Sequence, residues 1–264
     1  MVDRKVINLI MSEFGRRRRN SGDANLSKHD RFNPTLKTML RYFPDMRLTI
    51  YTDLLFEDIS LSKPWYSLNK SNIEIVRPVV PFDPSHPRYG WRASSYFRAY
   101  GLANSEHKIA IAADADLYVI SDAVKMIIPL VERFGVCFPL NPRFLVKTDT
   151  LVGADSDKIL DGTGGYGLAV NNGFMATDPT NSKALQFLEC YMKHRKQTGR
   201  GTIALWRATY ESGHNFNPYV LPPQWCVCKK HAGIGDEIVL HVGHKKVQDF
   251  YKPIMEKQDQ KFRS

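Results

Sequence analysis

Apolar and polar positions in the first third of the chain alternate between strand-like and helix-like spacing. Residues 5–10, 47–53 and 72–76 form short apolar or β-branched runs, which predict three strands. Between the first two runs, residues 33–43 place apolar side chains at helical spacing after Pro34, a residue suited to the first turn of a helix. A strand, a helix and a strand at this spacing are typical of a βαβ unit and indicate a parallel sheet.

A second helix and a fully apolar strand are predicted next. Residues 78–89 contain four prolines and predict a loop. Residues 91–104 place apolar side chains on one helical face, and Arg98 lies outside that face. In the run 109–113 every residue is apolar, which favours a strand covered on both sides, with its odd-numbered residues sharing one face.

The remainder of the chain predicts more helices and strands around one unassigned region. Residues 168–177 resemble a strand interrupted at residues 171–173, because glycine inside a strand indicates a bulge or a close backbone approach. The polar stretch 141–163 fits no element. The glycine cluster 162–167 predicts a loop near a ligand and lacks the strand-to-helix context of a dinucleotide-binding motif. Helices are further expected at 122–134, 181–196 and 201–212, and strands at 136–139 and 237–241, the last leading into a turn.

Two carboxylates follow the apolar run directly. Asp114 and Asp116 stand where the predicted strand 109–113 leaves the sheet. In open α/β sheets, ligands bind at the carboxyl ends of the strands. Two neighbouring acids in an apolar setting repel each other and are costly to bury without a counter-charge. Their oxygen ligands suit Mg²⁺ or Mn²⁺, so this pair is a candidate metal site.

The composition is that of a globular protein. A chain of 264 residues that is 43% hydrophobic can bury a substantial core as one α/β domain or one domain with a small appendage. No stretch reaches the ~20 apolar residues of a membrane span. The apolar run near the N-terminus is too short for a signal peptide and fits a first strand. We therefore expect a soluble protein made in the cytosol.

Cysteines and charge refine this view. The four cysteines form no disulfide framework, and the C-x-C pair of Cys226 and Cys228 lacks the second pair that a zinc site would want, so we interpret all four as reduced structural thiols. The net charge of +10 attracts nucleic acid, anionic membrane or acidic small molecules. The run Arg16–Arg19 is either a solvated loop or a region that steers a diphosphate substrate or docks on an anionic surface.

In its order of elements and in Asp114-Ala115-Asp116, the chain resembles the metal-dependent glycosyltransferases of the GT-A fold. Within them it is most similar to the glycogenin-like and lipopolysaccharide-galactosyltransferase-like group, which are retaining enzymes that use UDP-sugars. The resemblance implies one α/β domain over residues 1–264, with a mostly parallel twisted sheet flanked by helices and a nucleotide-sugar site at the carboxyl ends of the strands. Residues 1–122 would bind the nucleotide sugar, and residues 123–264 would hold the acceptor and a C-terminal metal and phosphate segment.

The resemblance also implies a metal centre. Asp114 and Asp116 would bind Mn²⁺ (or Mg²⁺), which bridges the two phosphates of the donor. Residues 241–246 are similar to the group's C-terminal H-x-x-G-x-x-K, although the spacing from histidine to glycine is one residue shorter. His241 is preferred as the third metal ligand because it ends an apolar strand, and His244 is the alternative.

Further positions are implied to contact the donor. Gly243, Lys245 and Lys246 are expected to contact the diphosphate, and Arg98 the donor sugar or phosphate. Asn171 and Asn172 are expected to line the sugar pocket, and Met11 and Ser12, just after the first strand, to hold the uracil base. The group's D-Q pair is not visible, because residues 201–205 occupy its place without a carboxylate. An inverting enzyme would need a carboxylate base, for which Asp161, Asp178 and Glu211 are the candidates. A retaining reaction is favoured over an inverting one.

These observations predict a glycosyltransferase that moves a hexose or pentose from a UDP-sugar to a saccharide, protein or lipid-linked acceptor. One alternative is a sugar nucleotidyltransferase, although Gly15 is the only glycine in the basic segment after the first strand. Another is a non-enzymatic nucleic-acid-binding module, which has no use for a buried D-x-D and would show a steep salt dependence. We expect no nucleic-acid partner, and the positive charge is compatible with peripheral association with an anionic membrane. The oligomeric state stays open.

Overall fold

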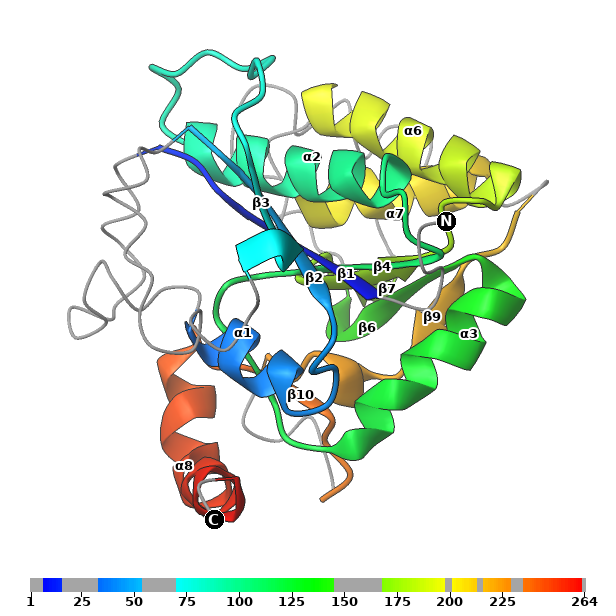
Figure 1. The fold of residues 1–264 in the computed structure, drawn as a ribbon. Coiled ribbons are helices and arrows are strands. Elements are labelled where there is room, and N and C mark those ends of the chain that lie inside the picture. Colours follow the sequence, from blue (N-terminus) through cyan, green and yellow to red (C-terminus); the bar gives the residue numbers. More distant parts are fainter. Residues whose placement is uncertain are drawn as a thin grey trace.

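The computed structural model describes residues 7–15, 33–53, 70–144, 168–197, 201–212, 216–228 and 235–262. Within these ranges, the centre of the molecule is an eight-stranded sheet with the order β3-β2-β1-β4-β8-β6-β7, and β9 pairs with β6 (Figure 1). Its strands are β1 (Ile7–Glu13), β2 (Arg47–Thr52), β3 (Ile73–Val76), β4 (Ile109–Ala113), β6 (Val136–Phe144), β7 (Leu168–Val170), β8 (Phe174–Thr177) and β9 (Tyr219–Leu221).

The N-terminal half of the sheet is parallel, as the sequence predicted. β1 pairs in parallel with β2 and β4, and β2 pairs in parallel with β3. β8 then joins β4 in the antiparallel direction, and β6 joins β8 the same way, whereas β9 runs parallel to β6. β4 therefore lies inside the sheet with a neighbour on each side, and its residues are all apolar because both of its faces are buried.

Helices cover both faces of the sheet, and each face has its own core. Figure 1 shows three helices on one face, α2 (Tyr89–Ala103), α6 (Ser182–Gln197) and α7 (Gly201–Ser212), and on the other α1 (Asn33–Leu40) and α3 (Ile127–Phe134). The odd-numbered residues of β4 pack into the core beside α1 and α3, and the even-numbered ones into the core beside α2, α6 and α7. The predicted shared face of residues 109, 111 and 113 is confirmed.

A small two-stranded sheet leads to the C-terminal helix. β5 (Leu117–Val119) pairs antiparallel with β10 (Val239–His241), and α8 (Lys245–Lys261) follows. The turn expected after residue 241 is present over residues 242–244, but it ends sooner than predicted because α8 begins at Lys245. Val247 and Tyr251, one helical turn apart, bury themselves in a third apolar cluster with Tyr118 and Leu240, and this packing stabilises the helix.

Other segments differ from the expectation in their bounds. β1 continues to Glu13, so Met11 and Ser12 lie within the first strand and not after it. Residues 122–126 form a 3-10 turn before α3, where one continuous helix was expected. The segment 168–177 contains two strands, because the chain crosses from a pairing with β6 to a pairing with β4 at residues 171–173. β9 was not predicted.

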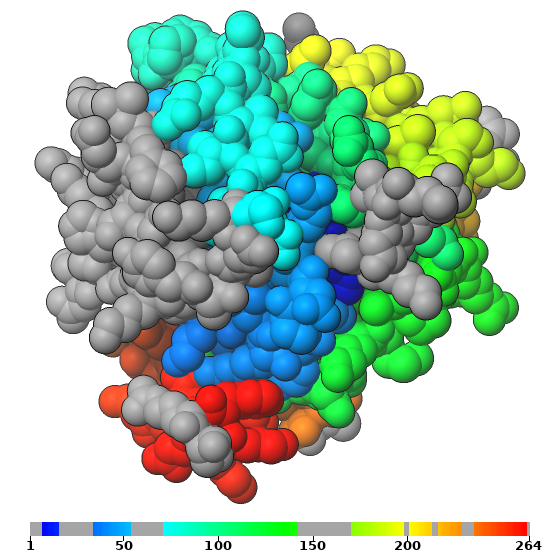
Figure 2. Space-filling view, viewed as in Figure 1, coloured from blue at the N-terminus to red at the C-terminus, as the bar shows by residue number. Residues whose placement is uncertain are grey.

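Ion pairs fasten α8 to the rest of the domain. Asp259 accepts a hydrogen bond from Lys37 at 2.8 Å and pairs with Arg41 and the hydroxyl of Tyr118. Although burial opposes it, these donors lower the pKa of Asp259 to about 2. Figure 2 shows α8 (red) beside the blue region of the chain that contains α1. None of the helices in the described ranges is long and apolar enough to cross a membrane.

Candidate functional site

The two carboxylates of the D-x-D motif lie in the tight connection between β4 and β5, at the carboxyl end of β4. Two threonines of α1 hold this connection. Thr35 Oγ1 donates to the carbonyl of Asp114 at 2.7 Å and accepts from the amide of Leu117 at 2.9 Å. Thr38 Oγ1 accepts from the amide of Val119 at 3.0 Å. Because both hydroxyls are fully buried, they satisfy backbone groups that water cannot reach, and they fix where the carboxylates emerge.

His241 reaches the carboxylates from β10. The strand pairing aligns His241 with Leu117, the residue directly after the motif. Its Nε2 lies 3.2 Å from Asp116 Oδ1 and 3.9 Å from Asp114 Oδ2. Of the three side chains, His241 and Asp114 are 15% and 18% exposed and Asp116 is 35% exposed, so the group is partly enclosed and still open to a ligand.

Two glycines bring backbone unusually close to the carboxylates. A Cβ added to Gly243 would lie 1.8 Å from Asp116 Oδ2, and one added to Gly173 would lie 2.7 Å from Asp114 Oδ2. Neither distance is compatible with a side chain, and neither glycine has a positive φ. The requirement for glycine is therefore the close approach itself, which the interrupted strand at 171–173 had indicated for Gly173.

Positively charged side chains balance the two carboxylates of the motif. Arg98, on α2, is buried and pairs with Asp114, in contrast to the sequence expectation that it lies off the packed face of that helix. Burial lowers the pKa of His241, but the Asp116 carboxylate and the Cys228 thiol outweigh burial and raise it to about 10. In the metal-free protein a protonated His241 thus bridges the acids, in the position that a metal cation would take over.

The ligand atoms of Asp114, Asp116 and His241 all lie within 4.8 Å of one another. Two carboxylates and one imidazole form a donor set that suits Mn²⁺ or Mg²⁺. The two glycines support this assignment, because a side chain at position 243 or 173 would occupy the space of the Asp116 or the Asp114 carboxylate. These residues could hold the metal that the D-x-D predicted.

The sequence reasoning missed two thiols that also reach His241. Cys228 Sγ lies 3.5 Å from His241 Nδ1, and Cys226 Sγ is in the same cluster. Asn171 Nδ2 donates to Cys228 Sγ at 2.9 Å. A hydrogen bond from Cys226 lowers the pKa of Cys228, burial opposes this, and both nearby histidines add to the lowering. The C-x-C spacing was the available signal, and it was set aside because no second cysteine pair exists in the sequence.

The residues predicted to line the donor site are partly brought together. Asn171 is buried against Cys228 and also accepts the Gly173 amide at 2.8 Å, while Asn172 donates to Tyr191 at 3.2 Å. Met11 is fully buried in the core, and the hydroxyl of Ser12 donates to the carbonyl of Ser94 at 2.9 Å. The roles of these residues in donor binding stay predictions.

The other predicted histidine and the lysines lie at the start of α8. His244 occupies the N-cap position of the helix without a side-chain capping bond and is exposed, and its ring contacts the His241 ring edge-on at 4.7 Å between centroids. Lys245 and Lys246 are exposed in the first turn, and Lys245 pairs with Asp249. The segment 243–246 therefore lies next to His241 through the chain itself, with two cations at a helix N-terminus.

Of the three predicted carboxylate bases, the two that lie in the described part of the chain, Asp178 and Glu211, are outside the cluster of Asp114, Asp116 and His241. Asp178 follows β8 at the end where Thr177 pairs with Ala110, the opposite end of β4 from Asp114, and it closes a turn by accepting the Thr180 amide at 2.9 Å. Glu211 lies on α7, 2.7 Å from His194. Asp161 lies outside the described residues, as do the run Arg16–Arg19 and the glycine cluster 162–167.

No family model matches the chain, and no curated protein matches it by sequence. Its structure is nevertheless similar to those of glycosyltransferases. The apo bifunctional glycosyltransferase WbbM shares 10% identity over 96% of this chain at a TM-score of 0.55, and the chain spans 49% of that protein's length. Apo mouse xyloside xylosyltransferase 1 shares 10% identity over 89% of this chain and 96% of its own, at a TM-score of 0.54.

A third similar structure is the galactosyltransferase LgtC in complex with donor and acceptor sugar analogues, at 9% identity, 95% coverage of each chain and a TM-score of 0.53. At such low identity the likeness shows the fold alone. The chain has the mixed α/β fold of the GT-A glycosyltransferases, with a mostly parallel central sheet flanked by helices, and this expectation from the sequence is confirmed.

Proposed function

We propose that this chain, with its GT-A glycosyltransferase fold, is a metal-dependent glycosyltransferase that takes its sugar from a UDP-sugar and transfers it to a saccharide, protein or lipid-linked acceptor. The observation that carries the proposal is the cluster of Asp114, Asp116 and His241 at the carboxyl end of β4. That edge of an open α/β sheet is where nucleotide ligands bind. Similar folds in a galactosyltransferase and a xylosyltransferase support glycosyl transfer as the reaction class.

The protein residues divide the work by charge. Asp114, Asp116 and His241 would hold Mn²⁺ or Mg²⁺, which when bound supplies Lewis-acid stabilisation of the diphosphate leaving group. Lys245 and Lys246, with the N-terminal end of α8, would bind the same phosphates, because helix N-termini and lysines both favour anions. Arg98 would orient Asp114 through their ion pair and add positive charge to the donor side.

Stereochemistry and acceptor are narrower parts of the proposal. A retaining reaction agrees with the positions of Asp178 and Glu211, which both lie outside the metal cluster. On the acceptor side, the Trp206 ring stacks on the exposed Tyr210 ring at 5.9 Å between centroids. Aromatic faces of this kind can pack against sugar rings, which favours a glycan acceptor.

The proposal is tested by calorimetry of UDP, GDP, CMP and ADP with the full chain, first with Mn²⁺ and then with EDTA. We expect UDP to bind in Mn²⁺ and the binding to vanish on chelation. Asp116→Asn should abolish the metal-dependent part. Asp122→Asn changes an exposed acid in the same segment and is the matched control, expected to bind like the parent. UDP binding unaffected by EDTA, or by Asp116→Asn, would contradict the metal centre.

A further inference from the structure

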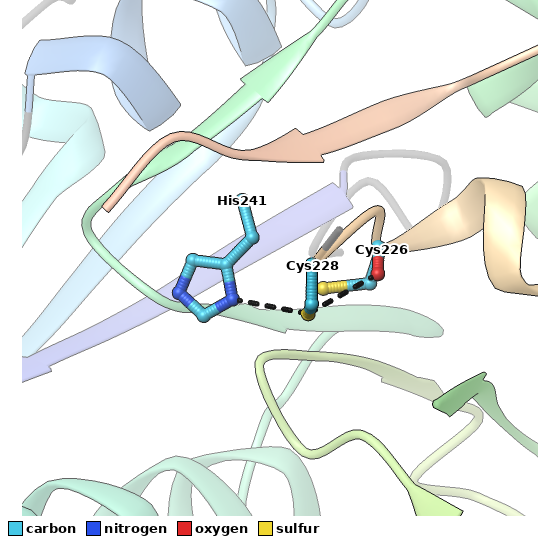
Figure 3. Close-up of side chains that lie close together, drawn as sticks. All are labelled: Cys226, Cys228 and His241. Carbon is cyan, nitrogen blue, oxygen red and sulfur yellow. Dashed lines mark hydrogen bonds between the residues drawn. The ribbon is translucent and has the colours of Figure 1, made fainter. Parts of the chain in front are cut away.

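A second set of metal-ligand side chains lies on the other edge of the His241 imidazole. Cys226, Cys228 and His241 point toward one another in Figure 3, and their ligand atoms lie within 4.8 Å of one another. All four cysteines of the protein are free thiols. The set uses Nδ1 of His241, whereas the carboxylates of the D-x-D motif face Nε2.

Strand geometry explains why two cysteines converge here. Residues 226–228 run beside β10, with Val227 bridged to Leu240 and its amide donating to Val239 at 2.9 Å. Because side chains alternate along an extended chain, Val227 packs with Leu240 in one apolar cluster, while Cys226 and Cys228 face the other way. His241 donates its amide to the Val227 carbonyl at 3.0 Å, which fixes the imidazole beside the thiols.

The distances suit a thiophilic ion. Tetrahedral zinc has Zn–S bonds of about 2.3 Å and Zn–N bonds of about 2.0–2.1 Å, which separates a sulfur from a nitrogen ligand by about 3.6 Å. The observed separation of Cys228 Sγ from His241 Nδ1 is 3.5 Å. Cys226 is fully buried, and Asn171 Nδ2 donates to Cys228 Sγ at 2.9 Å, as a group supporting a thiolate ligand would. His244 adds an imidazole on the exposed side of Cys228.

We propose that Cys226, Cys228 and the Nδ1 atom of His241 form a second metal site, for Zn²⁺ or a similarly thiophilic divalent cation. The fourth position would be filled by His244 or by solvent. Binding converts the two thiols to thiolates and releases their protons to solvent, and no electron is transferred. Two sulfurs and one nitrogen discriminate this site from the oxygen-rich D-x-D site, which suits harder cations.

The two sites compete for one imidazole. A neutral histidine has one nitrogen with a lone pair and one that carries hydrogen. When Nδ1 binds the thiophilic ion, Nε2–H faces Asp116 at 3.2 Å and is lost as a ligand to the other site. When Nε2 binds the harder ion, Nδ1–H faces Cys228. Occupation of the thiol site therefore opposes Mn²⁺ binding, and this consequence rests on the proposed function.

Cobalt is the probe for the thiol site, because Co²⁺ replaces zinc and thiolate ligation gives it a near-ultraviolet charge-transfer band. The reduced full chain, freed of metal, should bind about one Co²⁺ with this band and with the visible bands of tetrahedral cobalt, and Zn²⁺ should displace it. Cys226→Ser and Cys228→Ser should each weaken Co²⁺ binding at least ~10-fold. Cys190→Ser is the comparison variant, because Cys190 belongs to a separate candidate group with His194 and Glu211, and its loss should leave the band of the Cys226–Cys228 site unchanged.

Three results would overturn the thiol site. These are the absence of the charge-transfer band in fully reduced protein, a band that survives both Cys226→Ser and Cys228→Ser, or a band that Cys190→Ser abolishes. Circular dichroism of each variant separates lost binding from lost folding. If the serine variants do not fold, protection of the thiols of the parent protein from a maleimide by Zn²⁺ decides instead, because an unprotected Cys228 would contradict the proposal.

Failure of this site can be told apart from failure of the proposed function. In Asp114→Asn the cobalt band should persist while Mn²⁺ binding, followed by electron paramagnetic resonance, is lost. In the parent, added Zn²⁺ should release bound Mn²⁺, and in Cys228→Ser it should release at least ~10-fold less at the same concentration. Simultaneous binding of both ions in the parent would overturn the competition. A normal cobalt band without Mn²⁺ binding would overturn only the proposed metal centre of the enzyme.

Discussion

The two sides of His241 are built in opposite ways. On the Nε2 side, Asp114 and Asp116 belong to one short motif that ends β4, an interior strand of the sheet. On the Nδ1 side, Cys226 and Cys228 lie on an irregular segment in which Val227 forms an isolated β-bridge with Leu240. The carboxylates are partly exposed and the thiols are mostly buried.

This difference explains why a sequence motif predicted the carboxylate site and did not predict the thiol site. The two carboxylates are neighbours in the chain, so one short motif brings both to the end of β4, and Thr35 and Thr38 of α1 hold the connection that follows. The thiol pair forms a candidate metal site only because β10 places the His241 imidazole beside it. Oxygen ligands with some exposure suit an ion that must also contact a substrate, whereas buried sulfur ligands suit a structural ion that does not.

The largest expected effect is on the carboxylate side. Asp114→Asn or Asp116→Asn removes half of the negative charge that would hold the cation. We expect Mn²⁺-dependent turnover of a UDP-sugar, including its slow hydrolysis, to fall by roughly 100-fold or more. The cobalt band of the thiol side should be unchanged. A folded variant with parental turnover would contradict the role of the motif, and Asp122→Asn provides the baseline.

Removal of the shared imidazole should affect both sides. In His241→Ala, we expect Mn²⁺ affinity and Co²⁺ affinity each to fall by at least ~10-fold, because each site loses one ligand. His244→Ala should weaken Mn²⁺ binding much less, since its ring contacts His241 from the exposed end of α8. Titration of both metals by calorimetry measures the two losses. The opposite ranking of the histidines would mean that His244 is the ligand.

The glycines separate the two carboxylates. Gly243→Ala would place a methyl group 1.8 Å from Asp116 Oδ2 and must displace that carboxylate, whereas Gly173→Ala meets Asp114 Oδ2 at 2.7 Å. We expect Mn²⁺ affinity to fall by about 10-fold in Gly243→Ala and by less in Gly173→Ala. Both variants should fold, because neither glycine has a positive φ. Unchanged Mn²⁺ affinity in Gly243→Ala would show that Asp116 is not a ligand.

The smallest effect concerns an acid that serves the fold and no metal. Asp259 fastens α8 to α1, and its pKa is lowered to about 2, below its value of 3.8 as an ordinary carboxyl. A lowered pKa in the folded state contributes stability above about pH 4, and the contribution is lost as the pH falls toward 2. With a discount for its partial exposure, Asp259→Asn should cost about 1–2 kcal/mol of unfolding free energy at pH 7.

Urea unfolding of the parent and of Asp259→Asn at pH 7 and near pH 3 measures this cost. The difference between the two proteins should shrink at the lower pH, while Mn²⁺ and Co²⁺ affinities at pH 7 stay parental. A constant difference across the pH range would mean that the pairing of Asp259 with Lys37 and Arg41 is not the source of its stabilising effect.

The order of the first strands and helices, and the edge of the sheet at which the two acids lie, were predictable from the amino-acid sequence. The apolar run 109–113 predicted a strand covered on both sides, with the carboxylate pair at its carboxyl end, and the pairing of β4 with β1 and β8 agrees with this. These inferences hold because side-chain alternation and helical spacing are local properties of the chain. The prediction was wrong for α8, whose first residues were expected to be part of a turn, because this helix is stabilised by the packing of Val247 and Tyr251 against Tyr118.

The groups that approach the motif from distant parts of the chain could not be predicted from the sequence and are seen only in the folded structure. Thr35 supports the connection after β4 from 79 residues away in the chain. Cys228 contacts His241 because Val227 forms a β-bridge with Leu240, and the spacing of apolar residues does not predict this bridge. The close approach of Gly243 to Asp116 likewise depends on how β10 aligns with β5. Such contacts depend on strand register and helix docking, which sum many weak interactions over the whole domain. A short sequence pattern therefore does not predict strand register or helix docking.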